Sequence, residues 1–181
     1  LPALAAVAVG LVEGLGWGEI ARGLEAQAAA LRLAPKRVRG GGVTLLDDTY
    51  NASPLSTRAA LDLLAQLPGR RVGVLGDMLE LGAYEAQGHR EVGERAGEIL
   101  DVLVTVGPRA VGIADAAVRR GLPPEVVRMA ESVEEAIGIV ADLLREGDVL
   151  LVKGSRSVGL EALVAAIEER SEERRVGKEC R

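Results

Sequence analysis

The stretch VTLLDDTYNASPLS, Val43 to Ser56, combines three features that together indicate the fold. Its first six residues form a Val/Leu-rich run that ends in two carboxylates, which is typical of a buried strand ending at a ligand-binding edge. Ser53 is suited to cap the amino end of a helix, and Pro54 suits the first helical position because its missing N–H would be unbonded there. The stretch therefore predicts a strand, a polar loop and a helix in direct succession.

The same strand–helix unit recurs along the rest of the chain. Four further apolar runs predict strands at residues 71–76, 101–107, 125–130 and 148–154. The segments between the strands carry apolar residues at the i, i+3, i+4, i+7 spacing of one helix face. The first of these segments shows it with Ala60, Leu63, Leu64 and Leu67. Apolar strands alternating with amphipathic helices predict an α/β fold, with a doubly wound, mostly parallel, Rossmann-like sheet of five to six strands.

The amino-terminal part has a different character. Two Ala-rich helical patterns, separated by Gly14 and Gly16, predict a helical hairpin. The pattern changes after Pro35 and the glycine triplet Gly40–Gly42, which indicates a domain boundary. The chain is therefore expected to have three parts: residues 1–38, the end of one domain; residues 39–169, a second domain; and residues 170–181, a tail that is either artefactual or disordered.

Composition excludes several classes of function. The 181 residues carry a formal net charge of -5, which argues against a nucleic-acid partner because phosphate binding needs clustered Lys and Arg. No uncharged apolar run is long enough to cross a bilayer, so we expect a cytoplasmic protein without a membrane partner. The single cysteine, Cys180, lies in the tail. We therefore predict neither a thiolate nucleophile nor a cysteine metal cluster.

Polar residues follow three of the predicted strands. In open parallel sheets, ligands bind at the carboxyl ends of the strands, where loops and helix amino termini converge. These ends carry Asp47-Asp48, Gly76-Asp77 and Lys153-Gly154-Ser155-Arg156. We expect the three groups to meet at one edge of the sheet. For the two aspartates the alternative is a solvated loop in which a carboxylate binds its own backbone.

The segment KGSRS, Lys153 to Ser157, has the features of an anion site. Gly154 allows close backbone approach, the following helix supplies free N–H groups, and Lys153 and Arg156 add positive charge. A carboxylate or a phosphate would fit there. The alternative is a turn in which the basic residues are incidental.

The segment GDMLELG, Gly76 to Gly82, carries two carboxylates in a glycine-bounded loop. Asp77 and Glu80 are suited to hold an ammonium group or a metal ion, but solvation or capping of a helix explains them equally well. His89, the single histidine, falls on the helix that follows. We expect it on the helix surface rather than as a catalytic base.

Three motifs occur in order along the chain: DDTYNASPLS, then LGDMLELG with a downstream histidine, then LLVKGSRSVGLEALV. The set closely resembles the carboxyl-terminal domain of the Mur ligase family, in the members that add D-alanyl-D-alanine. Upstream, LPALAAVAVGL resembles a helix of the family's central ATPase domain, and APKR resembles its interdomain turn. The resemblance covers residues 1–169 and makes the hairpin a remnant of that ATPase domain. The alternatives are another Mur ligase, a folylpolyglutamate synthase-like ligase domain, or a non-catalytic module that binds a nucleotide or an anion.

The resemblance implies a reaction. Mur ligases phosphorylate a substrate carboxylate with ATP and Mg²⁺, and the incoming amine then attacks the acyl phosphate. The full protein would join D-alanyl-D-alanine to UDP-N-acetylmuramoyl-tripeptide in peptidoglycan precursor synthesis, as a monomer. This sequence contains no G-x-x-G-K-[ST] phosphate loop. We therefore expect the chain alone to be inactive, Mg²⁺ to bind mainly in the central domain, and no catalytic residue in this part.

The resemblance also implies two sets of binding residues. The nucleotide set consists of Asp48, Tyr50, Asn51 and Arg37. The set for D-alanyl-D-alanine consists of Lys153, Ser155, Arg156, Asp77 and Glu80. Matching of charge suggests that the basic loop holds the carboxylate of the dipeptide and that the acidic loop lies near its ammonium group.

Overall fold

The structure is a computed structural model that describes residues 2–28, 33, 35–38 and 42–169. Packing divides the chain into two compact units, Leu1–Arg32 and Leu33–Arg181, which are described separately. The predicted tail, with Cys180, lies outside the described residues. No helix in the described ranges is both long enough and apolar enough to cross a membrane.

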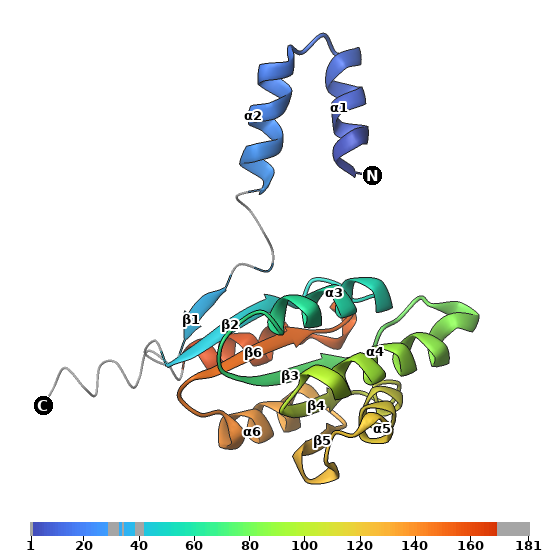
Figure 1. The fold of residues 1–181 in the computed structure, drawn as a ribbon, viewed down its shortest axis with the longest axis vertical. Coiled ribbons are helices and arrows are strands. Elements are labelled where there is room, and N and C mark those ends of the chain that lie inside the picture. Colours follow the sequence, from blue (N-terminus) through green and yellow to red (C-terminus); the bar gives the residue numbers. More distant parts are fainter. Residues whose placement is uncertain (1, 29–32, 34, 39–41, 170–181) are drawn as a thin grey trace, which may run out of the picture. The chain divides into compact units, whose positions relative to one another are not determined.

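The first unit is the helical hairpin that the sequence predicts. It consists of α1 (Pro2–Val12) and α2 (Trp17–Ala28), which can be followed in Figure 1. Gly14 turns the chain between them with φ +78°, a conformation that glycine adopts without steric cost. The helices touch where Gly10 faces Ile20, because a Cβ at Gly10 would lie 2.9 Å from the Ile20 side chain.

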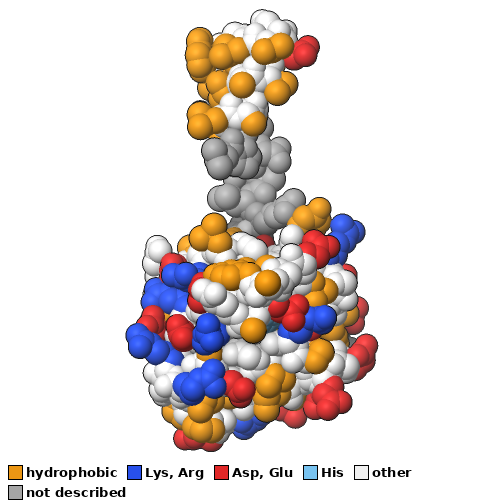
Figure 2. Space-filling view, turned by 90° about the vertical axis from the view of Figure 1, so that its right-hand side faces the viewer, with side chains coloured by type: hydrophobic (Ala, Val, Ile, Leu, Met, Phe, Trp, Pro, Cys, Tyr) orange, Lys and Arg blue, Asp and Glu red, His pale blue; other side chains and the backbone are white. Residues whose placement is uncertain are grey.

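Most apolar side chains of the hairpin are exposed. The large ones are Leu4, Val9, Leu11, Val12, Leu15 and Trp17. Figure 2 shows apolar side chains over the visible face of the hairpin, whereas charges of both signs cover the visible face of the second unit. The hairpin therefore has little buried apolar area of its own to stabilise it.

The second unit is a doubly wound α/β domain, which confirms the predicted fold class. Its six strands have the order β1-β2-β6-β3-β4-β5. They are β1 (Lys36–Val38), β2 (Val43–Asp48), β3 (Arg70–Gly76), β4 (Val102–Val106), β5 (Val127–Ala130) and β6 (Asp148–Lys153). Every pair of neighbours is parallel except β1 and β2. All five predicted strands are present. Strand β1 was not predicted, because three residues are too few to show the alternating pattern of a strand.

Helices cover both faces of this sheet. They are α3 (Pro54–Leu64), α4 (Glu85–Ile99), α5 (Val111–Arg120), α6 (Val133–Leu143) and a helical segment at residues 161–169, with short 3₁₀ turns η1 (Gly82–Tyr84), η2 (Pro124–Val126) and η3 (Arg156–Val158). One apolar cluster joins the sheet to α6 and residues 160–167, and the other joins it to α3, α4 and α5. Successive residues of β2 enter opposite clusters, Leu45 the first and Leu46 the second. The continuously apolar strands are explained by these two covered faces.

A partly buried ion pair lies at the amino ends of β3 and β6. Arg70 Nε and Nη2 donate to the two carboxylate oxygens of Asp148 at 2.9 and 2.7 Å, and the Asp148 side chain is 2 % exposed. The hydrogen bonds to Asp148 raise the pKa of Arg70 above its ordinary value. Because the two residues are register partners, this bidentate contact fixes the pairing of the two strands.

Glycines set the distance between α4 and α5. A Cβ at Gly93 would lie 2.3 Å from the carbonyl oxygen of Ile113 and 2.6 Å from Ala116 Cβ. One turn later, a Cβ at Gly97 would lie 2.7 Å from the carbonyl oxygen of Ala117. The two helices therefore approach to a separation that no larger residue permits.

The same substitution should have opposite effects at two helical glycines. Gly93→Ala should lower the free energy of unfolding by about 1–3 kcal/mol, because the methyl group has no space between α4 and α5. A Cβ added at Gly138 in α6 has no other atom within 4 Å. Gly138→Ala should therefore raise the free energy of unfolding by roughly 0.5–1 kcal/mol. Urea unfolding followed by circular dichroism measures both. Equal stability of the two variants would contradict the described contact.

The exposed apolar surface of the hairpin leads to a second prediction. Amides in the helical turns around Val9 and Ile20 should exchange with solvent far faster than those of β3 and β6, because few buried contacts oppose local opening. Hydrogen exchange read by mass spectrometry tests this. Protection in the hairpin equal to that of the central strands would show the prediction to be wrong.

Candidate functional site

The polar ends of β2, β3 and β6 lie at the same edge of the sheet. Strand β6 is between the other two and is parallel to both. In the register, Lys153 pairs with Asp48 on one side and with Leu75 on the other. The three loops that follow these strands therefore leave the sheet as neighbours, where ligands bind in open parallel sheets.

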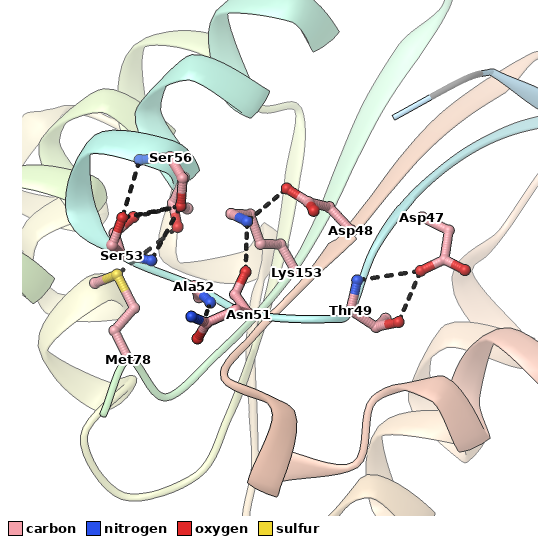
Figure 3. A network of polar contacts seen from close by, with 10 residues as sticks. Asp47, Asp48, Thr49, Asn51, Ala52, Ser53, Ser56, Met78 and Lys153 are labelled. Atoms are coloured by element: carbon pink, nitrogen blue, oxygen red, sulfur yellow. Dashed lines mark hydrogen bonds and ion pairs between the residues drawn. The ribbon is translucent and has the colours of Figure 1, made fainter. Parts of the chain in front are cut away.

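Lys153 is buried beneath this edge. Its side chain is 1 % exposed, and Nζ lies 2.5 Å from Asp48 Oδ2 and donates to the backbone oxygen of Asn51 at 2.7 Å (Figure 3). This position differs from the expected contact with a dipeptide carboxylate, because the ammonium is already neutralised within the protein. Lys153 instead ties the loop after β2 to β6.

The loop after β2 is further ordered by its own side chains. Asp47 accepts hydrogen bonds from the Thr49 N–H at 3.1 Å and the Thr49 hydroxyl at 2.8 Å. The local-bonding alternative raised by the sequence thus describes Asp47, while Asp48 pairs with Lys153. Asn51 Oδ1 accepts a hydrogen bond from the Ala52 N–H at 2.8 Å. The side-chain amide expected to bind the nucleotide therefore also stabilises its own loop.

The helix that follows this loop begins as the sequence predicts. Ser53 is the N-cap of α3: its hydroxyl accepts from the Ser56 N–H at 3.3 Å, and the Ser56 hydroxyl accepts from the Ser53 N–H at 3.0 Å. Pro54 follows the cap in the first turn. Figure 3 shows this reciprocal cap beside the Lys153 contacts. Both groups of bonds hold the short segment between Asp48 and Ser53.

The loop after β3 carries Asp77, which the structure buries. Asp77 is 5 % exposed, and its Oδ1 accepts from the backbone N–H groups of Arg109 and Ala110 at 2.9 and 2.7 Å. The Arg109 guanidinium lies 3.6 Å from Oδ2. These contacts hold the Asp77 carboxylate against the backbone just before α5 without a side-chain cap of that helix, and the carboxylate is not presented to a ligand as expected. It connects the loop after β3 to the start of α5.

Glu80, in the same loop, is exposed and has φ +62°, the only positive φ of a non-glycine residue in the described part of the chain. The left-handed conformation costs an L-residue about 1 kcal/mol or more. Such strain is found where the surrounding structure imposes it, and functional sites are enriched in it. The backbone of Glu80 is thus held in this exposed loop at some cost in stability.

The loop after β6 is joined to the loop after β3. The Ser155 N–H donates to the backbone oxygen of Asp77 at 3.0 Å, and the Ser155 hydroxyl accepts from the Leu79 N–H at 2.9 Å. Two glycines permit this approach, because a Cβ at Gly154 would lie 3.3 Å from Gly76 Cα and 2.7 Å from the Leu160 side chain. Ser155 itself is 6 % exposed.

A cleft of about 450 Å³ opens between these three loops. Its lining consists of Tyr50, Asn51, Leu79, Glu80, Ser155, Arg156 and Ser157. Arg156 lies over the Tyr50 ring, with Cζ 5.5 Å from the ring centroid. The cleft thus brings together five of the predicted residues, and it presents a cation and an anion on separate loops.

Arg37, which was expected at the site, lies elsewhere, and His89 does not have the position expected for it. Arg37 is on the β1–β2 pair, where Nη1 donates to Thr44 Oγ1 at 3.1 Å, and it does not line the cleft. His89 was expected on the helix surface, and this is wrong: it is 2 % exposed. Its Nε2 accepts from the Met78 N–H at 3.1 Å, and Nδ1 lies 2.8 Å from the carbonyl oxygen of Glu85. The hydrogen bond from Met78 joins the loop after β3 to α4.

Leu79 and Ser157 line the cleft, although the sequence did not single them out. Their positions offered a signal, since each is adjacent to a predicted residue: Leu79 precedes Glu80, and Ser157 follows Arg156. Among the described residues, no group of three or more His, Cys, Asp or Glu side chains is placed to hold a metal ion.

A second hollow of about 260 Å³ lies over α3, α4 and α5. Its lining is charged: Arg58, Glu91, Glu94, Arg95, Glu98 and Arg120. These charges largely neutralise one another, since Glu98 pairs with both Arg95 and Arg120. Hydrogen bonds from Arg95, then from Arg120, hold the pKa of Glu98 below its ordinary value. This hollow is therefore a network that joins helices rather than a ligand site.

Comparison with known proteins shows which proteins this chain is similar to. The family model described as "Mur ligase, glutamate ligase domain" matches residues 32–156, more than half of the chain. A UDP-N-acetylmuramoyl-tripeptide--D-alanyl-D-alanine ligase of Bacillus subtilis is 33% identical over 166 residues, which are 90% of this chain and 36% of that protein. The chain thus spans about a third of the length of this relative.

Solved structures give the same result. A crystal structure of MurF from Acinetobacter baumannii has a TM-score of 0.73 and 32% sequence identity, covering 92% of this chain and 37% of that one. MurF ligase from Thermotoga maritima in complex with ADP has a TM-score of 0.65 and 29% identity, covering 79% of this chain and 31% of that one.

The buried position of Lys153 yields a stability prediction. Lys153→Met should lower the free energy of unfolding by about 3 kcal/mol, because Asp48 and the Asn51 carbonyl lose their partner in a poorly solvated place. Lys36→Met is the matched control: Lys36 pairs with Glu168, but its side chain is 60% exposed. That change should cost less than about 1 kcal/mol. Equal losses in urea unfolding would contradict the structural role of Lys153.

Proposed function

The chain belongs to the Mur ligase family, and from this premise we propose that it is the carboxyl-terminal part of an ATP-dependent ligase. The ligase would join D-alanyl-D-alanine to UDP-N-acetylmuramoyl-tripeptide in peptidoglycan precursor synthesis, in the cytoplasm and as a monomer. The observation that carries this proposal is the cleft, in which Arg156 and Glu80 offer opposite charges on separate loops. The name of the Bacillus subtilis relative, which is 33% identical, supports the choice of amino substrate.

The reaction needs this part of the enzyme for positioning. The γ-phosphoryl group of ATP passes to the tripeptide carboxylate, and ADP leaves. The dipeptide amine, after losing a proton, then attacks the acyl carbon, and phosphate leaves as the C–N bond forms. Both steps depend on holding the reacting groups in line, which converts a reaction between free molecules into one within a complex.

A free dipeptide is a zwitterion, and the two charged walls of the cleft match it. Arg156 would bind the carboxylate, and Glu80 would orient the ammonium before it loses its proton. In the part of the chain that the structure describes, no ion pair joins Glu80 to Arg156. Each charge is thus available to a ligand, and the left-handed backbone of Glu80 supports a role beyond stability.

The nucleotide would lie on the side of the loop after β2. We propose that Asp48, Tyr50 and Asn51 contact it there and that Arg37 reaches it from β1. The loop is supported for this task, because Lys153 fixes both Asp48 and the Asn51 backbone. The related structure from Thermotoga maritima is a complex with ADP, which supports a nucleotide as a ligand of the intact ligase.

Lys153, Ser155 and Asp77 would act by positioning. Their polar atoms bind protein groups, and all three are at most 6 % exposed. Mg²⁺ would be held with the ATP phosphates, mainly by the central ATPase domain of the ligase.

The proposal predicts which Michaelis constant responds to which side chain. In the intact ligase, Glu80→Gln and Arg156→Gln should each raise the KM for D-alanyl-D-alanine by about tenfold or more, because each removes a charge-assisted contact. The KM for ATP should change little. Phosphate release with the dipeptide as the varied substrate measures the effect.

Arg128→Gln is the control, because Arg128 is exposed on β5 and does not line the cleft. It should leave both constants unchanged. The proposed function would be wrong if the intact wild-type enzyme consumed ATP with another amino acid but not with D-alanyl-D-alanine, or showed no ligation at all. In the second case the alternative of a binding-only module would replace it.

A further inference from the structure

Tyr50 and Arg156 form a contact between the two sides of the cleft. Tyr50 follows β2, Arg156 follows β6, and the guanidinium carbon lies 5.5 Å from the centre of the tyrosine ring. This distance is within the roughly 6 Å over which a cation is attracted to an aromatic face. Tyr50 is 51% exposed, so the contact is at the surface of the cleft rather than in the core.

The contact restrains the side chain of Arg156. Arg156 is exposed, and a free arginine samples many rotamers. The aromatic face limits this freedom and keeps the guanidinium beside the cleft. The backbone next to Tyr50 is itself restrained, because the backbone oxygen of Asn51 accepts a hydrogen bond from the buried ammonium of Lys153.

We propose that Tyr50 is a positioning residue for Arg156 and orients its guanidinium toward the carboxylate of the amino substrate. The inference rests on the proposed function and deepens it. The resemblance assigned Tyr50 to the nucleotide side, and the geometry gives its ring a further task in binding the dipeptide. The loops for the two ligands would then be linked through this one contact.

The kinetic test uses the intact ligase. Tyr50→Leu should raise the KM for D-alanyl-D-alanine roughly two- to five-fold, the effect of an exposed cation–π contact, with kcat nearly unchanged. Tyr50→Phe keeps the ring and should restore the wild-type KM for the dipeptide. In an Arg156→Gln background, Tyr50→Leu should cause no further rise. Any effect of the leucine on the KM for ATP should be equal in both backgrounds.

Tyr84, the other tyrosine of the chain, provides the matched control. It donates to Glu91 on α4 and does not line the cleft, so Tyr84→Leu should leave the KM for the dipeptide unchanged. The role of Tyr50 is overturned if Tyr50→Leu raises the KM for the dipeptide equally with and without Arg156, or does not raise it at all.

A spectroscopic test separates this inference from the proposed function. A guanidinium over an aromatic face experiences the ring current, so the side-chain protons of Arg156 should resonate upfield and lose this shift in Tyr50→Leu of the present chain. An unchanged Arg156 spectrum overturns the inference whatever the enzyme does. The other decisive outcome is a spectrum that responds as expected while the intact enzyme does not use D-alanyl-D-alanine. That pair of results overturns the proposed function and the substrate-binding role of Tyr50 together.

Discussion

The buried ammonium of Lys153 is the constraint on which the arrangement of the site depends. Removing a charge from water is unfavourable by several kcal/mol unless a counter-charge and hydrogen bonds replace the solvent. Asp48 and the carbonyl of Asn51 provide that replacement, although Asp48 is 105 residues away in sequence. The chain cannot place β6 in the centre of the sheet without also bringing the end of β2 to Lys153. Burial of one charge thereby fixes where the first loop of the cleft begins.

Hydrogen bonds join each of the neighbouring loops to the next, beginning at the loop after Lys153. Ser155, two residues after Lys153, binds the backbone of Asp77 and Leu79. Asp77 in turn binds the backbone N–H groups at the start of α5. Four loops from different parts of the chain are thus held by buried polar groups that face one another. A cleft built in this way is ordered before a ligand arrives, which lowers the conformational cost of binding.

Patterns local in sequence predicted the fold well, and contacts across the sheet could not be predicted. The run Val43–Asp48 and the Ser53 cap have signals within a few residues, and both were found as expected. Lys153 and Asp77 were expected to face ligands, but their partners depend on strand order, which periodicity does not determine. His89 misled for a related reason: its burial follows from packing of α4 against the loop after β3. Strand β1 was missed because pairing with β2, rather than its own composition, makes it a strand.

Burial separates the charged residues of this edge into two kinds. Lys153 and Asp77 have partners in the protein and are nearly inaccessible, so they contribute to shape. Glu80 and Arg156 border the cleft and are not paired with each other within the described residues. The tyrosine face restrains the guanidinium of Arg156, whereas the carboxylate of Glu80 belongs to a different loop with a left-handed backbone. A small zwitterion that reaches both walls can then satisfy the two charges at once, which neither water nor a singly charged ion does equally well.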